Sequence, residues 1–274
     1  ACFRGDAGPE LTPDTMLRAY GRILWALASA RVCPVHKMVL VSAPEDTVQH
    51  EFLDTWSLWL PEIGEGDLDH LVVEGGLYEE HVARRLTGDL PDGWASNFPI
   101  DALGAACEML GISQVYGKNA TLGGLTEAEL AVATSAGFRL LDAGPIEITT
   151  YFERLRCDPG KPQDRPQARY GRIYDWLKRG AGDGFELEPL RAILRQHILD
   201  NWPLGAGDQA LDYVLTARRL HSIRTAAKTH DLHPKRLRRI LTDAGFITET
   251  DLPDFEVIFD AVEAQGILEQ ASGW

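Results

Sequence analysis

Segment 222–243 constrains the fold of this 274-residue chain more than any other part of it. It reads Ser-Ile-Arg-Thr-Ala-Ala-Lys-Thr-His-Asp-Leu-His-Pro-Lys-Arg-Leu-Arg-Arg-Ile-Leu-Thr-Asp. Ala226 and Ala227 are small enough for two helices to cross closely, and Pro234 suits the first position of a helix, where no N–H donor is needed. Asp231 stands where the chain must turn sharply, and Asp is among the few residues that tolerate a positive φ. The pattern predicts two short helices joined by a tight turn.

The second of these helices is predicted to have one apolar and one basic face. Leu237, Ile240 and Leu241 recur at i, i+3 and i+4, with Leu232 expected in the core and His233 at the helix N-cap. Between positions 218 and 239 lie eight lysines and arginines and one acid, a net charge of +7, so the rest of the chain carries −21 to reach the total of −14. A localised basic face on an acidic body suits a protein that touches DNA with one surface and other proteins elsewhere.

We therefore interpret segment 222–243 as a helix-turn-helix that places its second helix in the major groove of DNA. The residues expected to contact DNA are Ser222, Arg224, Lys228, Lys235, Arg236, Arg238 and Arg239. Two other interpretations stay open. The segment could be an ordinary helical hairpin with a solvated, arginine-rich face, or a surface that docks protein while a partner holds the DNA.

The rest of the chain is predicted to be mainly helical, and its 45% hydrophobic and 25% charged residues are ordinary for a globular protein. Gly111 is expected to end one helix, whereas Thr126 and Glu129 form a capping box that opens another. A short strand is expected within 31–42. Apolar residues recur at helical spacing over 17–29, 46–60, 77–86, 100–110, 170–178, 187–201, 209–219 and 254–265.

The domain organisation follows from one segment, 158–168, which is rich in Pro, Gly and charged residues. We expect a zinc-knuckle-like segment over 1–44, a helical lobe over 45–157, a linker or exposed loop over 158–168, and a second helical lobe over 169–274. The chain opens at Ala1 without Met, which suggests a piece of a longer protein. It has neither a signal peptide nor an apolar run near the roughly 18 residues that span a membrane, so we expect a cytoplasmic protein.

A candidate metal site begins at Cys33-Pro-Val-His36, where a thiolate and an imidazole share one tight turn. Structural zinc takes four such ligands; Cys2 is the natural third, and the fourth is expected about two or three residues before it, outside this chain. Cys107, on the apolar face of a predicted helix, and Cys157, beside the predicted linker, are poorer candidates. We therefore expect Zn²⁺ as the cofactor, with Cys2, Cys33 and His36 as ligands. The alternative is a buried thiol near a surface histidine.

No catalytic motif stands out. The sequence contains no Gly-rich phosphate loop with a following Lys-Ser/Thr, no nucleophile elbow and no His-Glu-x-x-His metalloprotease motif. Scattered carboxylates have no spacing that would make one an acid and another a base, although acids far apart in sequence can still meet in a DNA-cutting triad. We therefore predict a protein that is not an enzyme.

Several of these segments resemble the TniQ/TnsD family of bacterial transposition proteins, which help to choose the insertion target. The opening Ala-Cys-Phe-Arg-Gly-Asp is similar to the end of that family's Cys-Pro-x-Cys half-knuckle, and Trp25 followed by Cys33-Pro-Val-His36 is similar to its Trp-then-Cys-Pro-x-His signature. Segment 136–145 and Ser-Ile-Arg-Thr-Ala-Ala-Lys also resemble it. Asp231 departs from the usual glycine of the turn.

This resemblance implies a bacterial, non-enzymatic adaptor that links target DNA, or an RNA-guided complex, to a transposition ATPase. It also implies zinc ligation by Cys2, Cys33 and His36, and DNA contacts around Arg224 and 235–239. One alternative is a pure protein–protein adaptor of a transposition complex. The other is a helix-turn-helix transcription regulator, which would bind its operator as a symmetric homodimer and need no ATPase.

Overall fold

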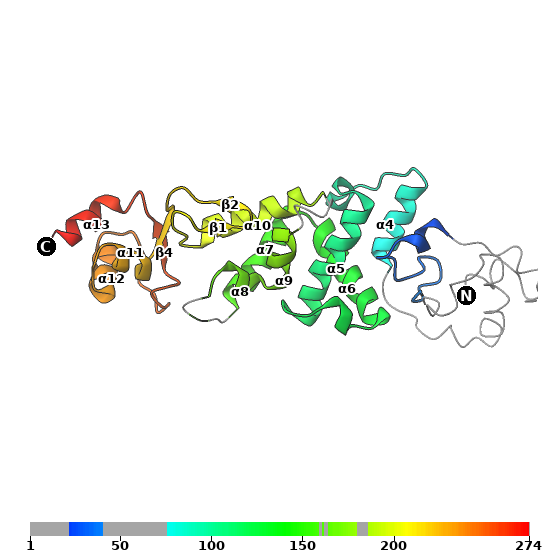
Figure 1. Cartoon of the computed structure of the whole chain (residues 1–274), viewed down its shortest axis with the longest axis horizontal. Helices are drawn as coiled ribbons and strands as arrows, with labels where there is room; N and C mark the ends of the chain where they lie inside the picture. The colour runs from blue at the N-terminus through cyan, green and yellow to red at the C-terminus, as the bar shows by residue number, and fades with distance from the viewer. Residues whose placement is uncertain (1–21, 41–75, 159–160, 162–163, 180–185, 274) are drawn as a thin grey trace, which may run out of the picture. The chain divides into compact units, whose positions relative to one another are not determined.

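The computed structural model describes residues 22–40, 76–158, 161, 164–179 and 186–273. This part of the chain is mainly helical, as predicted, and contains a few short strands (Figure 1). It divides into two compact units. One contains the chain up to Ile148 together with the residues just before Glu188, and the other contains Thr149 to Asp183 and the chain from Glu188 onward. Within the described ranges, no helix has both the length and the hydropathy required to cross a membrane.

The first unit contains η1 (Ile23–Ala26), α4 (Leu77–Leu86), η3 (Trp94–Asn97), α5 (Ile100–Tyr116), η4 (Leu122–Gly124) and α6 (Glu127–Asp142). Helix α4 has the predicted bounds, and Thr126 opens α6 with the predicted capping box. The predicted helix over 17–29 is a short 3-10 helix in its described part, and the predicted helix over 46–60 lies outside the described residues. In the described part of the strand expected within 31–42, Val32 and Val39 form an antiparallel bridge in place of a regular strand.

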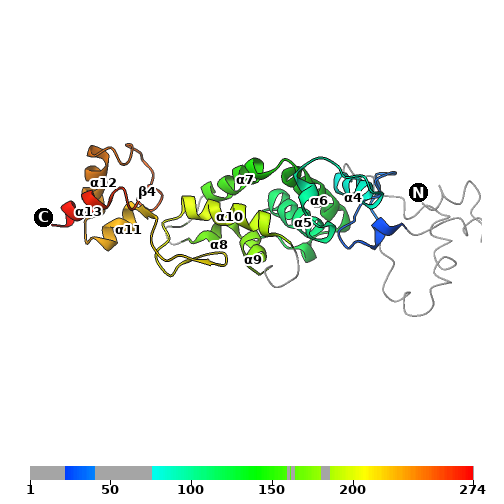
Figure 2. The ribbon, with the colours of Figure 1, turned by 90° about the horizontal axis from the view of Figure 1, so that it is seen from above.

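Helices α5 and α6 lie side by side in both views (Figures 1 and 2), and this packing corrects the prediction for Gly111. The helix does not end there but continues to Tyr116. A Cβ atom on Gly111 would lie 1.8 Å from the Ala133 carbonyl oxygen, and one on Gly137 would lie 1.9 Å from the Cys107 carbonyl oxygen. Gly111 therefore serves the close approach of α6 rather than a helix end.

The second unit contains most of α7 (Pro145–Cys157), followed by α8 (Pro166–Tyr170), α9 (Arg172–Arg179) and α10 (Glu188–Asn201). Helix α10 agrees with the prediction, but the predicted helix over 170–178 is interrupted. Gly171, with φ of 57° and ψ of −134°, separates α8 from α9, a conformation open to glycine because it has no Cβ.

A hairpin replaces the helix predicted over 209–219. Strands β1 (Gln209–Ala210) and β2 (Tyr213–Val214) pair antiparallel, with Gln209 opposite Val214. The turn between them is tied to α10 by Asp212, whose carboxylate lies 3.0 Å from both Arg191 Nη2 and Arg195 Nη2. The helical spacing in the sequence is thus overridden by contacts with residues from a distant part of the chain.

The C-terminal part of the second unit, residues 220–273, is called the C-terminal module below. It consists of β3 (Leu220–Ser222), α11 (Ile223–Thr229), α12 (Pro234–Asp243), β4 (Ile258–Asp260) and α13 (Gln265–Ser272). The prediction of a helix over 254–265 is wrong, because β4 pairs with β3 and a helix begins only at Gln265. Both views place α11, α12 and α13 around a common centre (Figures 1 and 2), where Ile223, Leu237 and Leu268 are fully buried.

Candidate functional site

Helix α11 begins at a capped end whose residues have structural roles. The Ser222 hydroxyl accepts a hydrogen bond from the Thr225 amide, and the Thr225 side chain bonds back to the Ser222 amide at 2.8 Å. This reciprocal capping satisfies two of the donors that a helix N-terminus leaves unpaired. Ser222 is buried, so it does not lie on the surface where it was expected to approach DNA.

The crossing of α11 and α12 has the local features predicted from sequence. Ala226 and Ala227 are buried in the core of the module, and Leu232 packs against that core. Asp231 has a φ of 53°. Pro234 is the first residue of α12, after His233 in extended conformation. Each feature follows from a local rule of turn and cap chemistry, which is why the sequence predicts them.

Five of the seven residues expected to contact DNA are exposed: Arg224, Lys228, Lys235, Arg236 and Arg239. Within the described part of the chain, none of these five side chains takes part in a hydrogen bond or an ion pair. Several other arginines of the described chain are paired, as Arg31 is with Glu108 and Arg195 with Asp212. We call these five residues the basic face.

The basic face has a simple helical origin. On α12, Lys235, Arg236 and Arg239 lie at i, i+1 and i+4, on the side opposite the buried Leu237 and Leu241. On α11, Arg224 and Lys228 lie four residues apart and therefore share an edge of that helix. The two helices thus present two sets of cations, one at positions 224 and 228 and one at 235–239.

Arg238 is the second exception to the expected contact set. Its guanidinium donates to the Asp254 carboxylate, at 2.8 Å from Nη2, and to the carbonyl oxygens of Thr250 and Leu252 at 2.9 and 2.7 Å. These partners belong to the connection between α12 and β4, which the sequence analysis had assigned in part to a helix. The Arg238 guanidinium is therefore bound to acceptors of the module itself.

His221 is a buried residue of the module that the sequence analysis missed. It stacks on Phe259 of β4, with ring centroids 6.1 Å apart, and its Nδ1 lies 3.2 Å from Thr225 Oγ1. Burial, together with the neighbouring Arg218 and His230 side chains, lowers the pKa of His221 to about 4. His221 is therefore neutral at pH 7. Only the pairing of β3 with β4 creates this environment, so no local pattern could have indicated it.

The two metal-ligand candidates within the described chain lie close together. Cys33 Sγ is 3.4 Å from His36 Nδ1, and the turn that carries them is closed by a 2.8 Å hydrogen bond from the Lys37 amide to the Cys33 carbonyl. Zinc–sulfur and zinc–nitrogen bonds of ordinary length at a tetrahedral angle place such a ligand pair about 3.6 Å apart. The donor set and its spacing therefore fit one edge of a zinc tetrahedron.

The third candidate ligand, Cys2, lies outside the described residues. Among the residues that are described, no group of three or more His, Cys, Asp or Glu side chains could hold a metal ion. The Cys33–His36 turn is anchored on α4, because Glu79 Oε1 accepts the amides of Arg31 and Val32 at 2.8 and 3.0 Å. Lys37, at the other end of the turn, pairs with Glu80.

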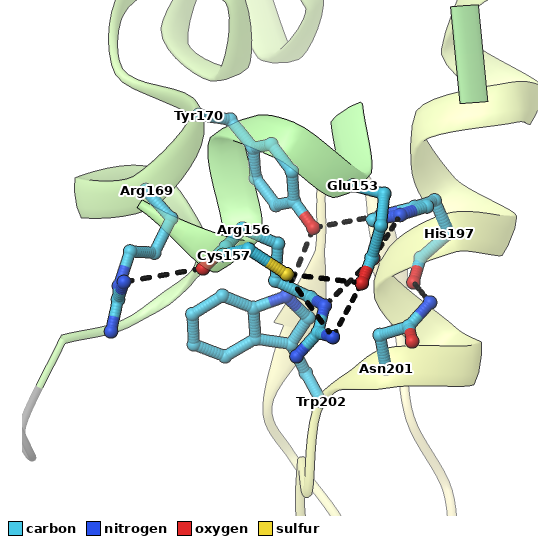
Figure 3. A network of polar contacts seen from close by, with 8 residues as sticks. All are labelled: Glu153, Arg156, Cys157, Arg169, Tyr170, His197, Asn201 and Trp202. Carbon is cyan, nitrogen blue, oxygen red and sulfur yellow. Dashed lines mark hydrogen bonds and ion pairs between the residues drawn. The ribbon is translucent and has the colours of Figure 1, made fainter. Parts of the chain in front are cut away.

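A polar network in the second unit braces α7, α8 and α10 (Figure 3). Trp202 Nε1 donates to the Tyr170 hydroxyl at 3.0 Å, and that hydroxyl lies 2.8 Å from His197 Nδ1. His197 Nε2 is 3.1 Å from Glu153 Oε2, and Arg156 donates to the same carboxylate. Burial lowers the pKa of His197, and the hydrogen bond from Arg156 lowers the pKa of Glu153 to about 2.

This network has a consistent direction of donation. If Tyr170 donates to Nδ1 of a neutral His197, then Nε2–H donates to the Glu153 carboxylate, and every polar group in the series has a partner. The sequence analysis did not predict this cluster, since its members lie on α7, α8 and α10 and just after α10, and they meet only in the folded unit. Its evident contribution is to hold those helices together.

The chain was compared with protein-family models, curated proteins and solved structures, and no match was found in any of the three.

Proposed function

We propose that this protein is a DNA-binding adaptor for transposition target selection, and that α11 and α12 form a helix-turn-helix. The single observation that carries the DNA-binding part is the basic face. Five exposed cations on two adjacent helices, without an intramolecular partner in the described chain, leave positive charge available for phosphates and guanine edges. The role in transposition rests on the resemblance of the sequence to the TniQ/TnsD family.

In this proposal the two helices have different tasks. Lys235, Arg236 and Arg239 on α12 would enter the major groove, where lysine and arginine bind guanine edges. Arg224 and Lys228 on α11 would lie along the phosphate backbone, which positions the protein without reading sequence. The acidic remainder of the chain, with its charge of −21, would contact protein partners such as a transposition ATPase or an RNA-guided complex.

Zinc belongs to the proposal as a structural cofactor near the N-terminus. Cys33 and His36 would supply two ligands, and Cys2 the third. The metal would hold the segment together, because in small units the free energy of metal binding contributes directly to folding.

The experiment is selection from a pool of random duplex DNA by the purified protein at two salt concentrations, followed by sequencing of the recovered DNA. An enriched motif that is retained at the higher salt supports a sequence-reading helix-turn-helix. Negligible affinity at both salt concentrations would contradict DNA binding. It would favour a pure protein–protein adaptor, for which the charge of −21 outside the basic segment is the supporting observation. A palindromic motif bound by a homodimer would favour a transcription regulator.

A further inference from the structure

Arg238 and Asp254 join α11 and α12 through another segment of the module, the connection between α12 and β4. The side chain of Arg238, on α12, binds Asp254 through two donors, Nε at 3.1 Å and Nη2 at 2.8 Å, to the same carboxylate oxygen. Its remaining hydrogen bonds go to the carbonyl oxygens of Thr250 and Leu252. A planar guanidinium can satisfy these acceptors at once because its N–H groups point in fixed, different directions.

The same connection also holds the N-terminus of α11. The Arg224 amide donates to the Asp254 carbonyl at 3.0 Å, and the Ile223 amide donates to the Val257 carbonyl at 3.2 Å. These are amides of the first turn, which a helix cannot pair internally. Asp254 is therefore bound to both helices, to α12 through its carboxylate and to α11 through its carbonyl.

We propose that Arg238 is not a DNA contact but a positioning residue, which acts with Asp254 to fix α11 relative to α12. This inference rests on the proposed function. The spacing between Arg224 and Lys228 on one helix and the cations of α12 decides whether both sets reach one duplex. Loosening the Arg238–Asp254 pair lets α11 and α12 move apart and weakens binding, although every cation of the basic face is still present.

Substituting a carboxylate of this connection tests the proposal, because a pure charge effect and a positioning role predict opposite changes in DNA affinity. The connection is acidic, with Glu249, Asp251, Asp254 and Glu256 within eight residues. If these carboxylates acted on DNA only through their charge, removing any of them would strengthen binding. Under the positioning role, removing Asp254 weakens binding, while removing the exposed Asp251 does not.

The experiment compares Asp254→Ala, Arg238→Lys and the matched control Asp251→Asn in the full chain, with random duplex DNA or a selected duplex as the probe. We expect Asp254→Ala and Arg238→Lys each to lower affinity about 10-fold, an effect of about 1.4 kcal/mol. Arg238→Lys keeps the charge but loses the planar fork. Asp251→Asn is expected to bind at least as tightly as the parent. The dependence of affinity on salt is expected to become shallower in Asp254→Ala and Arg238→Lys, because Arg224 and Lys228 no longer reach the phosphates together with the cations of α12, and to stay unchanged in Asp251→Asn.

The positioning role would be overturned if Arg238→Lys bound DNA as tightly as the parent. It would also be overturned if Asp254→Ala bound DNA as tightly as the parent or more tightly. A second measurement needs no DNA. Amide hydrogen exchange at Arg224 is expected to be faster in Asp254→Ala and Arg238→Lys than in the parent and in Asp251→Asn. Unchanged exchange in both variants would overturn the positioning role alone, whereas a parent protein without DNA affinity would overturn the proposed function itself.

Discussion

The dependence of DNA affinity on salt measures directly how many cations of the basic face meet phosphates. Each phosphate that a cation neutralises releases a counterion, which contributes about −0.9 to the slope of log K against log salt concentration. If all five cations act in this way, the slope is about −4.5, and affinity falls about 500-fold between 50 and 200 mM salt. The slope is smaller in magnitude if some cations of α12 contact base edges and not phosphates.

The perturbation is the double substitution Arg236→Ala and Arg239→Ala on the exposed side of α12. It makes the slope shallower by up to about 1.8, so that affinity falls only about 40-fold over the same salt range. At a fixed 100 mM salt we expect affinity to fall about 30-fold, from a loss of about 1 kcal/mol for each contact. The assay is fluorescence anisotropy of a labelled duplex at several salt concentrations.

The double variant should fold as the parent does, since both side chains are exposed, no described partner is lost, and alanine is at least as good a helix former as arginine. A matched control removes two exposed cations elsewhere, Arg139→Ala on α6 and Arg172→Ala on α9. If the α12 variant keeps the slope and the affinity of the parent, Arg236 and Arg239 do not contact DNA. If the control variant loses as much affinity as the α12 variant, binding depends on overall charge and not on the basic face.

Three further predictions concern stability and metal binding. Gly111→Ala places a Cβ against the Ala133 carbonyl and must push α5 and α6 apart; a loss of about 2 kcal/mol is expected in urea unfolding, and an unchanged midpoint would contradict the close packing. Because the pKa of His221 is lowered to about 4, the unfolded chain takes up a proton first as pH falls below 6.5. Stability that is fully present above pH 6.5 should therefore fall by up to about 3 kcal/mol by pH 4, and His221→Asn should flatten this part of the profile; parallel profiles would argue against it. Titration with Co²⁺ should give thiolate-to-metal absorption that is lost in Cys33→Ser and kept in Cys157→Ser, and equal absorption in both variants would exclude Cys33 as a ligand.

Much of the local structure could be predicted because short-range physics decides it. The capping box of Thr126 and Glu129, the bounds of α4, the first residue of α12 at Pro234 and the positive φ at Asp231 all depend on neighbours within a few residues. The basic face also follows from sequence, since its cations alternate with the buried Leu237 and Leu241 at helical spacing. The sequence therefore predicts that these cations lie on an exposed helix face, and five of the seven named residues are exposed.

The environments of Ser222 and Arg238, and the pairing of the strands near them, depend instead on the tertiary structure. Ser222 and Arg238 look like surface contacts in the sequence, but the first is buried where β3 meets β4 and the second is bound to Asp254, sixteen residues later. The same holds for the hairpin around Asp212, where helical spacing is overridden by ion pairs with α10. Side-chain patterns report which face of an element is apolar, but not which distant element will pair with it. Which elements pair depends on how the whole core packs. The same packing determines which arginines of the described chain have an intramolecular partner and which can bind a ligand.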